Sequence, residues 1–363
     1  MYKTSHTRRH RNPPSGSVVV GIDTHLDIHH AALVDAATGA PVADQQFPAT
    51  PAGYLELLDW AVGHGRVSRA GVEQTGTYGA GLSAVLHAAG IEVIEINHTE
   101  RGDRARHGKT DELDAYRAAT AAAAGTQKGL AKHYHPAIAA LRPLMVLRAH
   151  HRSSRQRAWG RVGGMLVTCP DDLADQVRGL NSAQKLARIA AWRPDLTRLH
   201  DPVNSYKLAL RDLARACLDH DRAIVEIDAQ LLRILTPIAP TLLAQHHVGP
   251  VTTAQLLITA GHPGRITSGD AFAKLVGVAP LPVQSGKSSR WRLSRSGDRQ
   301  ANSVIHRVVI GRLGTDPRSK TYIQRRVSEG KTRSEAIRAL KRHVTRDLWT
   351  ALQTDLNNLP HTT

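Results

Sequence analysis

Four carboxylates are spaced as a divalent metal site requires: Asp23, Glu73, Asp111 and Asp114. Asp23 and Glu73 each end a short apolar run typical of a buried strand, and the other two are three residues apart in a helical segment. Positions i and i+3 share one face of a helix, so both carboxylates can point at one place. Hard cations such as Mg²⁺ prefer oxygen ligands, and two such ions about 3.5–4 Å apart stabilise both oxygens of a phosphodiester under attack. The four acids therefore predict metal-assisted chemistry on a phosphate ester.

Each acid also has a plainer structural role. Asp23 can end its strand in a turn, and Asp111 can cap a helix that begins at Glu112. Asp27 and Glu112 are neighbouring acids that compete for the same assignment. The order of a strand Asp, a strand Glu and a helical Asp-x-x-Asp favours the metal site, because an open sheet can bring its strand ends beside one helix.

The elements that must position these acids alternate in an α/β order. We predict strands at residues 18–22, 31–34, 69–72 and 91–96, and helices at residues 82–89 and 111–124. The second strand returns antiparallel to the first. This order predicts an α/β domain over residues 17–136. It is preceded by a flexible basic arm at residues 1–16, where Arg8, Arg9 and Arg11 lie close together.

The composition points to a polyanionic partner. The chain has 363 residues and a formal net charge of +17, which is length enough for two or three domains with cores of their own. Such a charge favours nucleic acid or an anionic membrane surface. No apolar run approaches the roughly 18–20 residues of a membrane span, and the N-terminus lacks a signal-peptide core. Cys169 and Cys217 lie far apart, so we expect neither a disulfide framework nor a thiolate zinc site, as suits a reducing cytoplasm.

Two long amphipathic stretches follow, at residues 137–160 and 206–235, with apolar residues at helical spacings. Helices of this length usually pack as a hairpin or a coiled coil. A dimer arm and a helical core explain the pattern equally well. We assign residues 137–238 to this helical segment and residues 239–363 to a mainly helical C-terminal domain.

The C-terminal domain carries much of the excess charge. Predicted helices at residues 254–260 and 268–275 flank a Gly-Pro-rich turn, as in a helix-hairpin-helix, whose backbone N–H groups can face phosphates. From Lys287 to Arg346 there are 17 lysines and arginines against four acids. This excess predicts salt-dependent binding of a phosphate backbone. We assign nucleic-acid contacts to the first five cations of this stretch: Lys287, Arg290, Arg292, Arg295 and Arg299.

Several motifs carry a family resemblance. They read GIDTH at residues 21–25, GVEQTGTYG at 71–79, KTDELDA at 109–115 and GVAP at 277–280, followed by a Ser-Gly pair at 285–286. With these motifs the chain resembles the DEDD transposases of insertion sequences, the family of the Piv invertase and the bridge-RNA-guided serine recombinases. The resemblance extends from about residue 17 to about residue 315.

The resemblance implies a RuvC-like, RNase H-type N-terminal domain, a helical coiled-coil insertion and a C-terminal transposase domain. It makes Asp23, Glu73, Asp111 and Asp114 ligands of Mg²⁺, and it makes Ser285 the nucleophile that attacks DNA and forms a covalent phosphoserine. It also implies donor and target DNA and a structured guide RNA as partners. We further expect a homo-oligomer, dimer or tetramer, in the bacterial cytoplasm and associated with the nucleoid.

The residues alone leave alternatives open. The Ser285-Gly286 pair also reads as a loop turn, and other serines lie within a dozen residues: Ser288, Ser289, Ser294 and Ser296. Three functions remain: a recombinase with a serine nucleophile, a RuvC-like junction nuclease that uses water, and a non-catalytic nucleic-acid-binding protein. A recombinase must conserve bond energy while strands change partners, and a covalent serine intermediate does so.

Overall fold

The computed structural model describes residues 16–96, 110–125, 129–285, 288–293 and 297–359, with the backbone alone over residues 282–293. The chain divides into two compact units, Met1–His133 and Tyr134–Thr363. Each described hydrophobic cluster lies within one unit.

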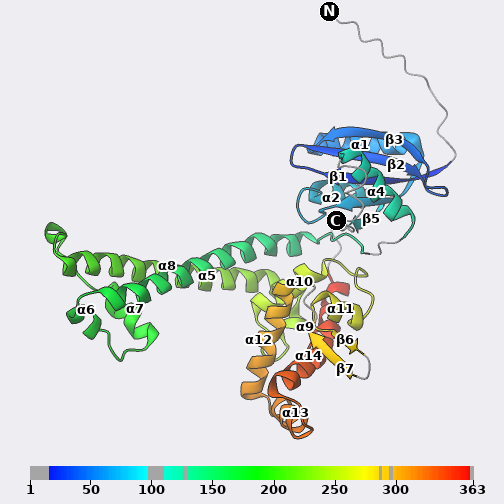
Figure 1. Cartoon of the computed structure of the whole chain (residues 1–363). Coiled ribbons are helices and arrows are strands. Elements are labelled where there is room, and N and C mark those ends of the chain that lie inside the picture. Colours follow the sequence, from blue (N-terminus) through cyan, green and yellow to red (C-terminus); the bar gives the residue numbers. More distant parts are fainter. Residues whose placement is uncertain (1–15, 97–109, 126–128, 286–287, 294–296, 360–363) are drawn as a thin grey trace, which may run out of the picture. The chain divides into compact units, whose positions relative to one another are not determined.

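The first unit is a five-stranded mixed sheet with helices on both faces (Figure 1). Its elements in chain order are β1 (Ser17–Thr24), β2 (Ile28–Asp35), β3 (Pro41–Pro48), α1 (Pro51–His64), β4 (Arg66–Glu73), α2 (Ala80–Ala88), β5 (Glu92–Ile96) and α4 (Asp111–Ala123). The strand order is β3-β2-β1-β4-β5. The first three strands form an antiparallel meander, whereas β4 runs parallel to both β1 and β5. The carboxyl ends of β1 and β4 therefore meet at one edge of the sheet.

The mixed α/β class and most of these elements confirm the sequence predictions, but β3 and α1 were missed. β3 is an edge strand with mostly exposed side chains, so it lacks the apolar pattern of a buried strand. α1 starts with a Pro at its first position behind Thr50, whose hydroxyl accepts a hydrogen bond from the Gly53 N–H. The Thr-Pro pair was a usable helix-start signal.

Helix α4 lies directly against the sheet, backbone to backbone. Gly21 of β1 and Gly71 of β4 are paired in register. A Cβ built on Gly21 would stand 2.1 Å from the backbone O of Ala115, and one on Gly71 would stand 2.4 Å from the backbone O of Ala118. Only glycine in the strands, facing small residues on the helix, allows this approach. The position of α4 on the sheet is therefore set by main-chain atoms.

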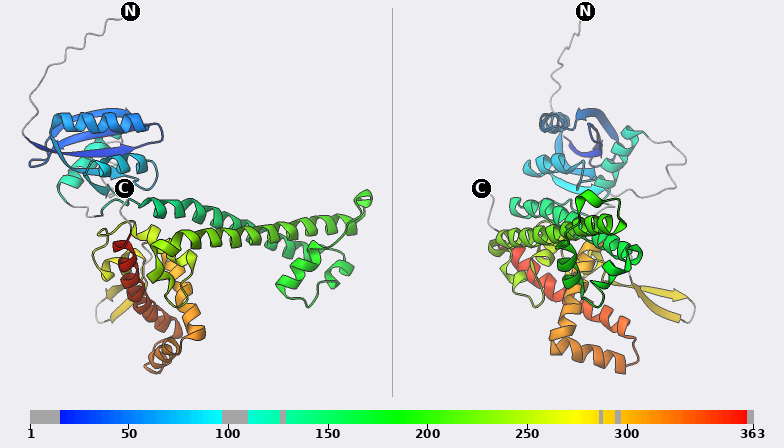
Figure 2. Two further views of the ribbon diagram at one scale, coloured as in Figure 1. Left: turned by 180° about the vertical axis from the view of Figure 1, so that it is seen from behind. Right: turned by 90° about the vertical axis from the view of Figure 1, so that its left-hand side faces the viewer.

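The opposite face of the sheet holds the larger hydrophobic cluster of this unit. Leu57 of α1 and Leu82 and Leu86 of α2 are fully buried there, against Ile22 and Leu33 of the sheet. Each buried leucine contributes about 1.5–3 kcal/mol. The right-hand view of Figure 2 shows the sheet between α1 and α2 on one side and α4 on the other.

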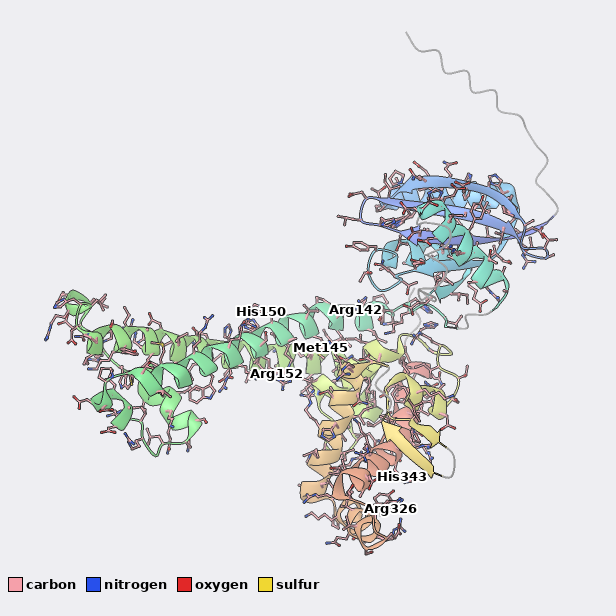
Figure 3. The ribbon with its side chains drawn as sticks, in the orientation of Figure 1. Arg142, Met145, His150, Arg152, Arg326 and His343 are labelled. Carbon is pink, nitrogen blue, oxygen red and sulfur yellow. The ribbon has the colours of Figure 1, made fainter. Side chains whose placement is uncertain are left out.

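The second unit begins with a long helical hairpin. Helices α5 (Pro136–Thr168) and α8 (Pro202–Ile238) pack side by side (Figures 1 and 2). They confirm the two amphipathic stretches predicted from the sequence, and both extend farther than predicted. Figure 3 draws the side chains of this hairpin, among them Arg142, His150 and Arg152 on α5.

A small group of helices closes the far end of the hairpin: α6 (Asp171–Asp175), α7 (Ser182–Ala190) and the 3-10 helix η1 (Leu196–Arg198). Leu173, Leu186 and Ile189 pack there against the hairpin. Cys169 and Cys217 are buried in the same cluster as free thiols. This end of the hairpin thus has a core of its own.

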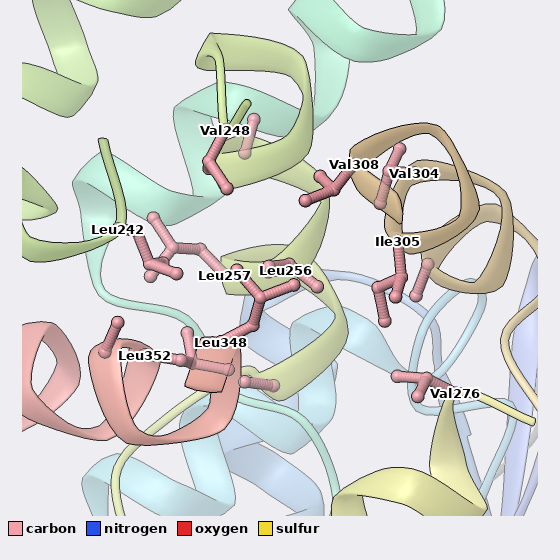
Figure 4. Close-up of a cluster of buried hydrophobic side chains, with 14 of the residues drawn as sticks. Leu242, Val248, Leu256, Leu257, Val276, Val304, Ile305, Val308, Leu348 and Leu352 are labelled. Carbon is pink, nitrogen blue, oxygen red and sulfur yellow. The ribbon is translucent and has the colours of Figure 1, made fainter. Parts of the chain in front are cut away.

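The other end of the hairpin packs into a larger helical core. The remaining helices are α9 (Pro240–Leu243), α10 (Pro250–Ala260), α11 (Gly269–Leu275), α12 (Arg299–Thr315), α13 (Pro317–Ser328) and α14 (Arg333–Asn357). Figure 4 shows Leu242, Leu257, Val304 and Leu348 converging from four of them. The predicted pair of helices around the Gly-Pro turn is confirmed as α10 and α11. Among the described helices, none is both long and apolar enough to cross a membrane.

A two-stranded hairpin completes the second unit. Strands β6 (Pro280–Ser285) and β7 (Ser288–Leu293) pair antiparallel. In the right-hand view of Figure 2 this ribbon extends away from the helices. Its base is anchored by Asn302, whose side-chain amide donates to the carbonyls of Val276 (2.7 Å) and Gly277 (3.1 Å). Lys341 donates in turn to Asn302 Oδ1 at 2.6 Å, and burial lowers the pKa of that lysine to about 8.

The backbone contact of α4 predicts a large effect of a single methyl group. We expect Gly21→Ala to lower the free energy of unfolding by about 3 kcal/mol or more, because the new Cβ overlaps main-chain atoms that have no rotamer to change. Gly63→Ala in α1 is the matched control, since a Cβ there meets nothing within 4 Å. The control substitution should leave the free energy of unfolding unchanged or raise it by up to about 1 kcal/mol. Urea denaturation followed by circular dichroism measures both, and equal stability of the two variants would contradict the proposed contact.

Candidate metal centre

The carboxyl ends of β1 and β4 place two of the predicted acids side by side along the sheet. Ile22 and Val72 are register partners on these parallel strands, and Asp23 and Glu73 follow them directly. Both carboxylate residues are nearly buried, at 4% and 5% exposure. Buried carboxylates require a compensating partner such as a metal ion, a cation or hydrogen-bond donors. This edge of the sheet therefore has the character of an ion site.

The first turn of α4 supplies the other two predicted acids. The side chain of Thr110 caps the helix by accepting from the Leu113 N–H, and the helix itself begins at Asp111. The alternative in which Asp111 caps a helix starting at Glu112 is thus wrong. The Asp111 side chain is 48% exposed, whereas Asp114 is buried. Carboxylates in the first turn are also stabilised by the positive end of the helix dipole.

His25 joins Asp23 to Asp111. Its Nε2 atom lies 3.1 Å from Asp23 Oδ2 and 3.5 Å from Asp111 Oδ1. One donor atom from each of these three residues lies within 4.8 Å of the others, a separation that a single cation can span. The sequence analysis did not assign a role to His25. Its place two residues after Asp23, where a strand residue shares the same face, was the signal that could have found it.

Asp114 lies outside this three-residue cluster. Its Oδ1 atom accepts a hydrogen bond from Arg117 at 3.0 Å. Its Oδ2 atom is buried and has no hydrogen-bond partner among the described residues. An unsatisfied buried carboxylate oxygen is costly, and a nearby cation would remove the cost.

Glu73 is held by its backbone. The Thr24 hydroxyl donates to the Glu73 carbonyl at 3.1 Å. The next residue, Gln74, has a φ of 48°, in the left-handed region that non-glycine residues rarely adopt. A Cβ on Gly79 would stand 2.7 Å from the same carbonyl. Strained backbone of this kind persists only where the surrounding structure enforces it, and it is concentrated at functional sites.

A buried histidine lies beside the site on β2. His29 is fully buried, pairs in register with Thr24, and stacks on Tyr54 at 5.5 Å between ring centroids. Burial lowers the pKa of His29, so the ring is neutral near pH 7. It therefore adds no positive charge that would compete with a cation for Asp23.

The predicted nucleophile and cations belong to the second unit. Ser285 is the last residue of β6 and pairs in register with Ser288, so it lies at the end of the strand next to the turn, while Gly286 lies outside the described residues. Arg290 and Arg292 belong to β7, two residues apart along the strand. Arg299 is exposed at the start of α12. Lys287 and Arg295 lie outside the described residues.

The donor set suits a divalent cation. Two carboxylates and an imidazole offer oxygen and nitrogen ligands in one small volume. Carboxylate oxygens suit Mg²⁺ and Mn²⁺, and the imidazole extends the range to Zn²⁺. The half-exposed Asp111 leaves one side of this cluster open to a substrate.

Comparison with known proteins gives two family matches. Residues 20–169, which include the four acids and His25, match a profile of DEDD transposases of the IS110 type, described as "Transposase". Residues 240–324, which include Ser285, match the "Transposase IS116/IS110/IS902 family".

Two curated relatives also come from insertion elements. The chain is 32% identical over 127 residues to a 42 kDa protein of insertion element IS900 from Mycobacterium paratuberculosis, covering 34% of this chain and 32% of that protein. It is 31% identical over 119 residues to a 43.6 kDa protein of insertion element IS110 from Streptomyces coelicolor, covering 32% of this chain and 29% of the relative. The aligned part thus spans about a third of each relative. Together with the two profiles, these matches show that the chain belongs to the IS110-type family of DEDD transposases.

Proposed function

We propose that the protein is an insertion-sequence transposase that cuts and rejoins DNA. The observation that carries this proposal is the cluster of Asp23, His25 and Asp111 beside the buried Glu73 and Asp114, in a chain with a net charge of +17. Local acids within a basic protein suit a metal that works on a polyanion. In this proposal the first unit is a RuvC-like, RNase H-type domain.

The four acids hold Mg²⁺ in the proposed mechanism. When bound there, a divalent ion would supply Lewis-acid chemistry to a scissile phosphate and would favour loss of a proton from an attacking hydroxyl. Asp23 and Asp111 would hold the ion together with Glu73 and Asp114. The Nε2 atom of His25 lies between the carboxylates of Asp23 and Asp111, so the ring orients both of them. Arg117 keeps one oxygen of Asp114 fixed and leaves the other available.

Ser285 is the proposed nucleophile. Its Oγ attacks the phosphorus, a P–Oγ bond forms, and the bond from phosphorus to the leaving strand oxygen breaks. The Ser285 proton passes to a base or to solvent, and the leaving oxygen takes up a proton to become a free hydroxyl. The phosphoserine conserves the energy of the broken bond, so a second strand can reverse the step. The backbone position of Ser285 supports this role, because it is the last residue of β6 before the hairpin turns, and loops that join rigid elements often carry functional residues.

The proposed partners follow from the family and the charge. Donor and target DNA are the substrates, and an element-encoded bridge RNA directs the choice of sites by base pairing. The stretch that begins with Lys287, Arg290, Arg292, Arg295 and Arg299 binds the phosphate backbones. The active form is a homo-oligomer in the bacterial cytoplasm, and residues 137–238 form its helical segment.

The serine mechanism predicts a covalent adduct. With Mg²⁺, element-end DNA and the element-encoded RNA, the wild-type protein should give a protein–DNA band that survives a denaturing gel. Ser285→Ala should remove at least about 99% of this band, since no other group replaces the nucleophile. Ser288→Ala is the matched control and should keep the adduct. Cleaved DNA without an adduct would support a RuvC-like hydrolytic nuclease, and neither product would support a non-catalytic binding protein. An adduct that survives Ser285→Ala would move the nucleophile to another serine.

The metal site predicts stabilisation by divalent ions. Saturating Mg²⁺ or Mn²⁺ should raise the melting temperature of the wild type, since a ligand at 100 times its Kd stabilises by about 2.7 kcal/mol. Asp23→Asn should abolish most of the shift. Glu112→Gln, in the same helical turn but exposed and outside the cluster, should retain it. Equal shifts in both variants, measured by differential scanning fluorimetry, would place the ion elsewhere.

Because the acids and Ser285 belong to different units, we propose that the complete site forms between two protomers. Asp23→Ala and Ser285→Ala proteins, each inactive alone, should then recover up to about a quarter of wild-type adduct when mixed and allowed to exchange subunits. The control is a mixture of wild type with the double variant Asp23→Ala/Ser285→Ala at the same total concentration. No recovery despite exchange, followed by mass-tagged subunits, would argue for a site within one chain.

A further inference from the structure

An arginine-lined groove lies on the second unit, away from the predicted cations of the β6–β7 ribbon. It has a volume of about 620 Å³ and is formed by α5, α10 and α12. Its basic lining residues are Arg142, Arg148, Arg152 and Arg307, and a smaller adjoining hollow adds Arg155. Figure 3 shows Arg142, Met145 and Arg152 along α5 at this place.

Three of the arginines form a row on α5. Arg148, Arg152 and Arg155 are separated by four and three residues, which puts them on one face of the helix. The outer two are anchored to α8: Arg148 donates to Asp228 at 2.9 Å, and Arg155 donates to Asp221 at 3.1 Å. These ion pairs orient the row and leave its middle member unpaired.

Arg152 and Arg307 are the unpaired members. Both are exposed, and in the described part of the chain neither makes an ion pair. Burial, followed by the nearby charges of Arg152 and Arg148, lowers the pKa of Arg307. An arginine stays protonated in spite of such a shift, so the crowding of like charges remains as a cost in the free protein. An anion between these guanidinium groups would remove that cost and gain charge-assisted hydrogen bonds.

We infer that this groove binds the phosphodiester backbone of a nucleic-acid strand, as a site separate from the metal centre. The inference rests on the proposed function, because it gives the transposase a second place to hold its nucleic acid. The arginines from Arg142 to Arg155 extend over 13 residue steps of α5, about 20 Å of helix. That length exceeds a single phosphate, and a strand with a rise of about 3.4 Å per nucleotide places about six phosphates along it.

The remaining lining suits a strand as well. Met145 and Ile258 offer apolar surface to sugars, and the exposed Gln156 and Gln300 offer neutral hydrogen-bonding groups. The arginines contact phosphates, which every strand carries whatever its sequence. The groove therefore orients a strand without selecting its sequence, consistent with phosphate contacts that position and do not specify.

Binding measured without metal tests the groove apart from catalysis. Affinities for a 30-nucleotide DNA strand and an RNA strand of the same sequence are measured by fluorescence anisotropy in EDTA at several salt concentrations. The double variant Arg152→Gln/Arg307→Gln should bind about tenfold more weakly at 150 mM salt. Its plot of log K against log salt should be less steep by about 1.4, the value for two lost contacts to a single strand.

The matched control removes the same charge from the same hairpin. Arg157→Gln/Arg161→Gln changes two exposed arginines of α5 that do not line the groove. It should leave the salt slope within about 0.5 of wild type, so that an effect of net charge alone is distinguished from an effect of the groove. A larger effect on RNA than on DNA would assign the groove to RNA, and the reverse would assign it to DNA.

A second readout needs no substitution. Met145 lines the groove, whereas Met165 packs at the far end of the hairpin. A bound strand should slow the peroxide oxidation of Met145 at least about threefold and leave Met165 unchanged, since oxidation follows exposure. One outcome would overturn the inference and leave the proposed function standing. In it the wild type binds a strand, the groove variant keeps the wild-type salt slope, and the bound strand does not protect Met145. Absence of any binding by the wild type would overturn the proposed function with it.

Discussion

The contact of α4 with the glycines of β1 and β4 controls the geometry of the whole first unit. Gly21 and Gly71 lie side by side in the sheet, and the backbone of α4 at Ala115 and Ala118 takes the space that two side chains would fill. A contact between main chains has no rotamers to adjust, so it fixes the height of the helix above the sheet. Asp111 begins that same helix, one turn before the contact. The 3.5 Å separation between His25 and Asp111 is thus a consequence of packing residues that carry no chemistry.

The same contact brings carboxylates close to one another, and the free-energy cost of their burial and mutual repulsion must be offset. Asp23, Glu73 and Asp114 are nearly buried. Each additional carboxylate raises the cost of the others unless a cation, a proton or a helix dipole offsets it. The protein meets part of this cost with Arg117 and with the first turn of α4, but one oxygen of Asp114 remains unsatisfied among the described residues. A site that is incomplete in the free protein and completed by a divalent ion accounts for this residual cost.

The four acids could be singled out from the sequence, together with the strands that precede two of them, because each stands in a local pattern of apolar or helical residues. Asp23 and Glu73 follow apolar runs, and the Asp-x-x-Asp pair opens an alanine-rich helix. His25 was missed because its role depends on a fold that brings residues 23 and 111 together, which no local pattern records. β3 was missed because an edge strand needs little apolar surface. The arginine row on α5 was visible as charge, but its pairing with Asp221 and Asp228 is set by the register of two helices far apart in sequence.

The predicted metal ligands and Ser285 belong to different units, and each unit has its own hydrophobic core. Every member of the clusters that support Asp23 and Asp111 lies before residue 134, and every member of the cluster around α10, α12 and α14 lies after it. The base of the Ser285 hairpin is anchored within this second core, through Asn302 and Lys341. We therefore expect a substitution at an acid to leave the packing around the hairpin intact, and a substitution at Ser285 to leave the clusters of the first unit intact. The proposed assembly of one site from two copies of the chain requires that each unit keep its fold when the other unit carries a substitution. Separate hydrophobic cores are the physical basis for expecting this.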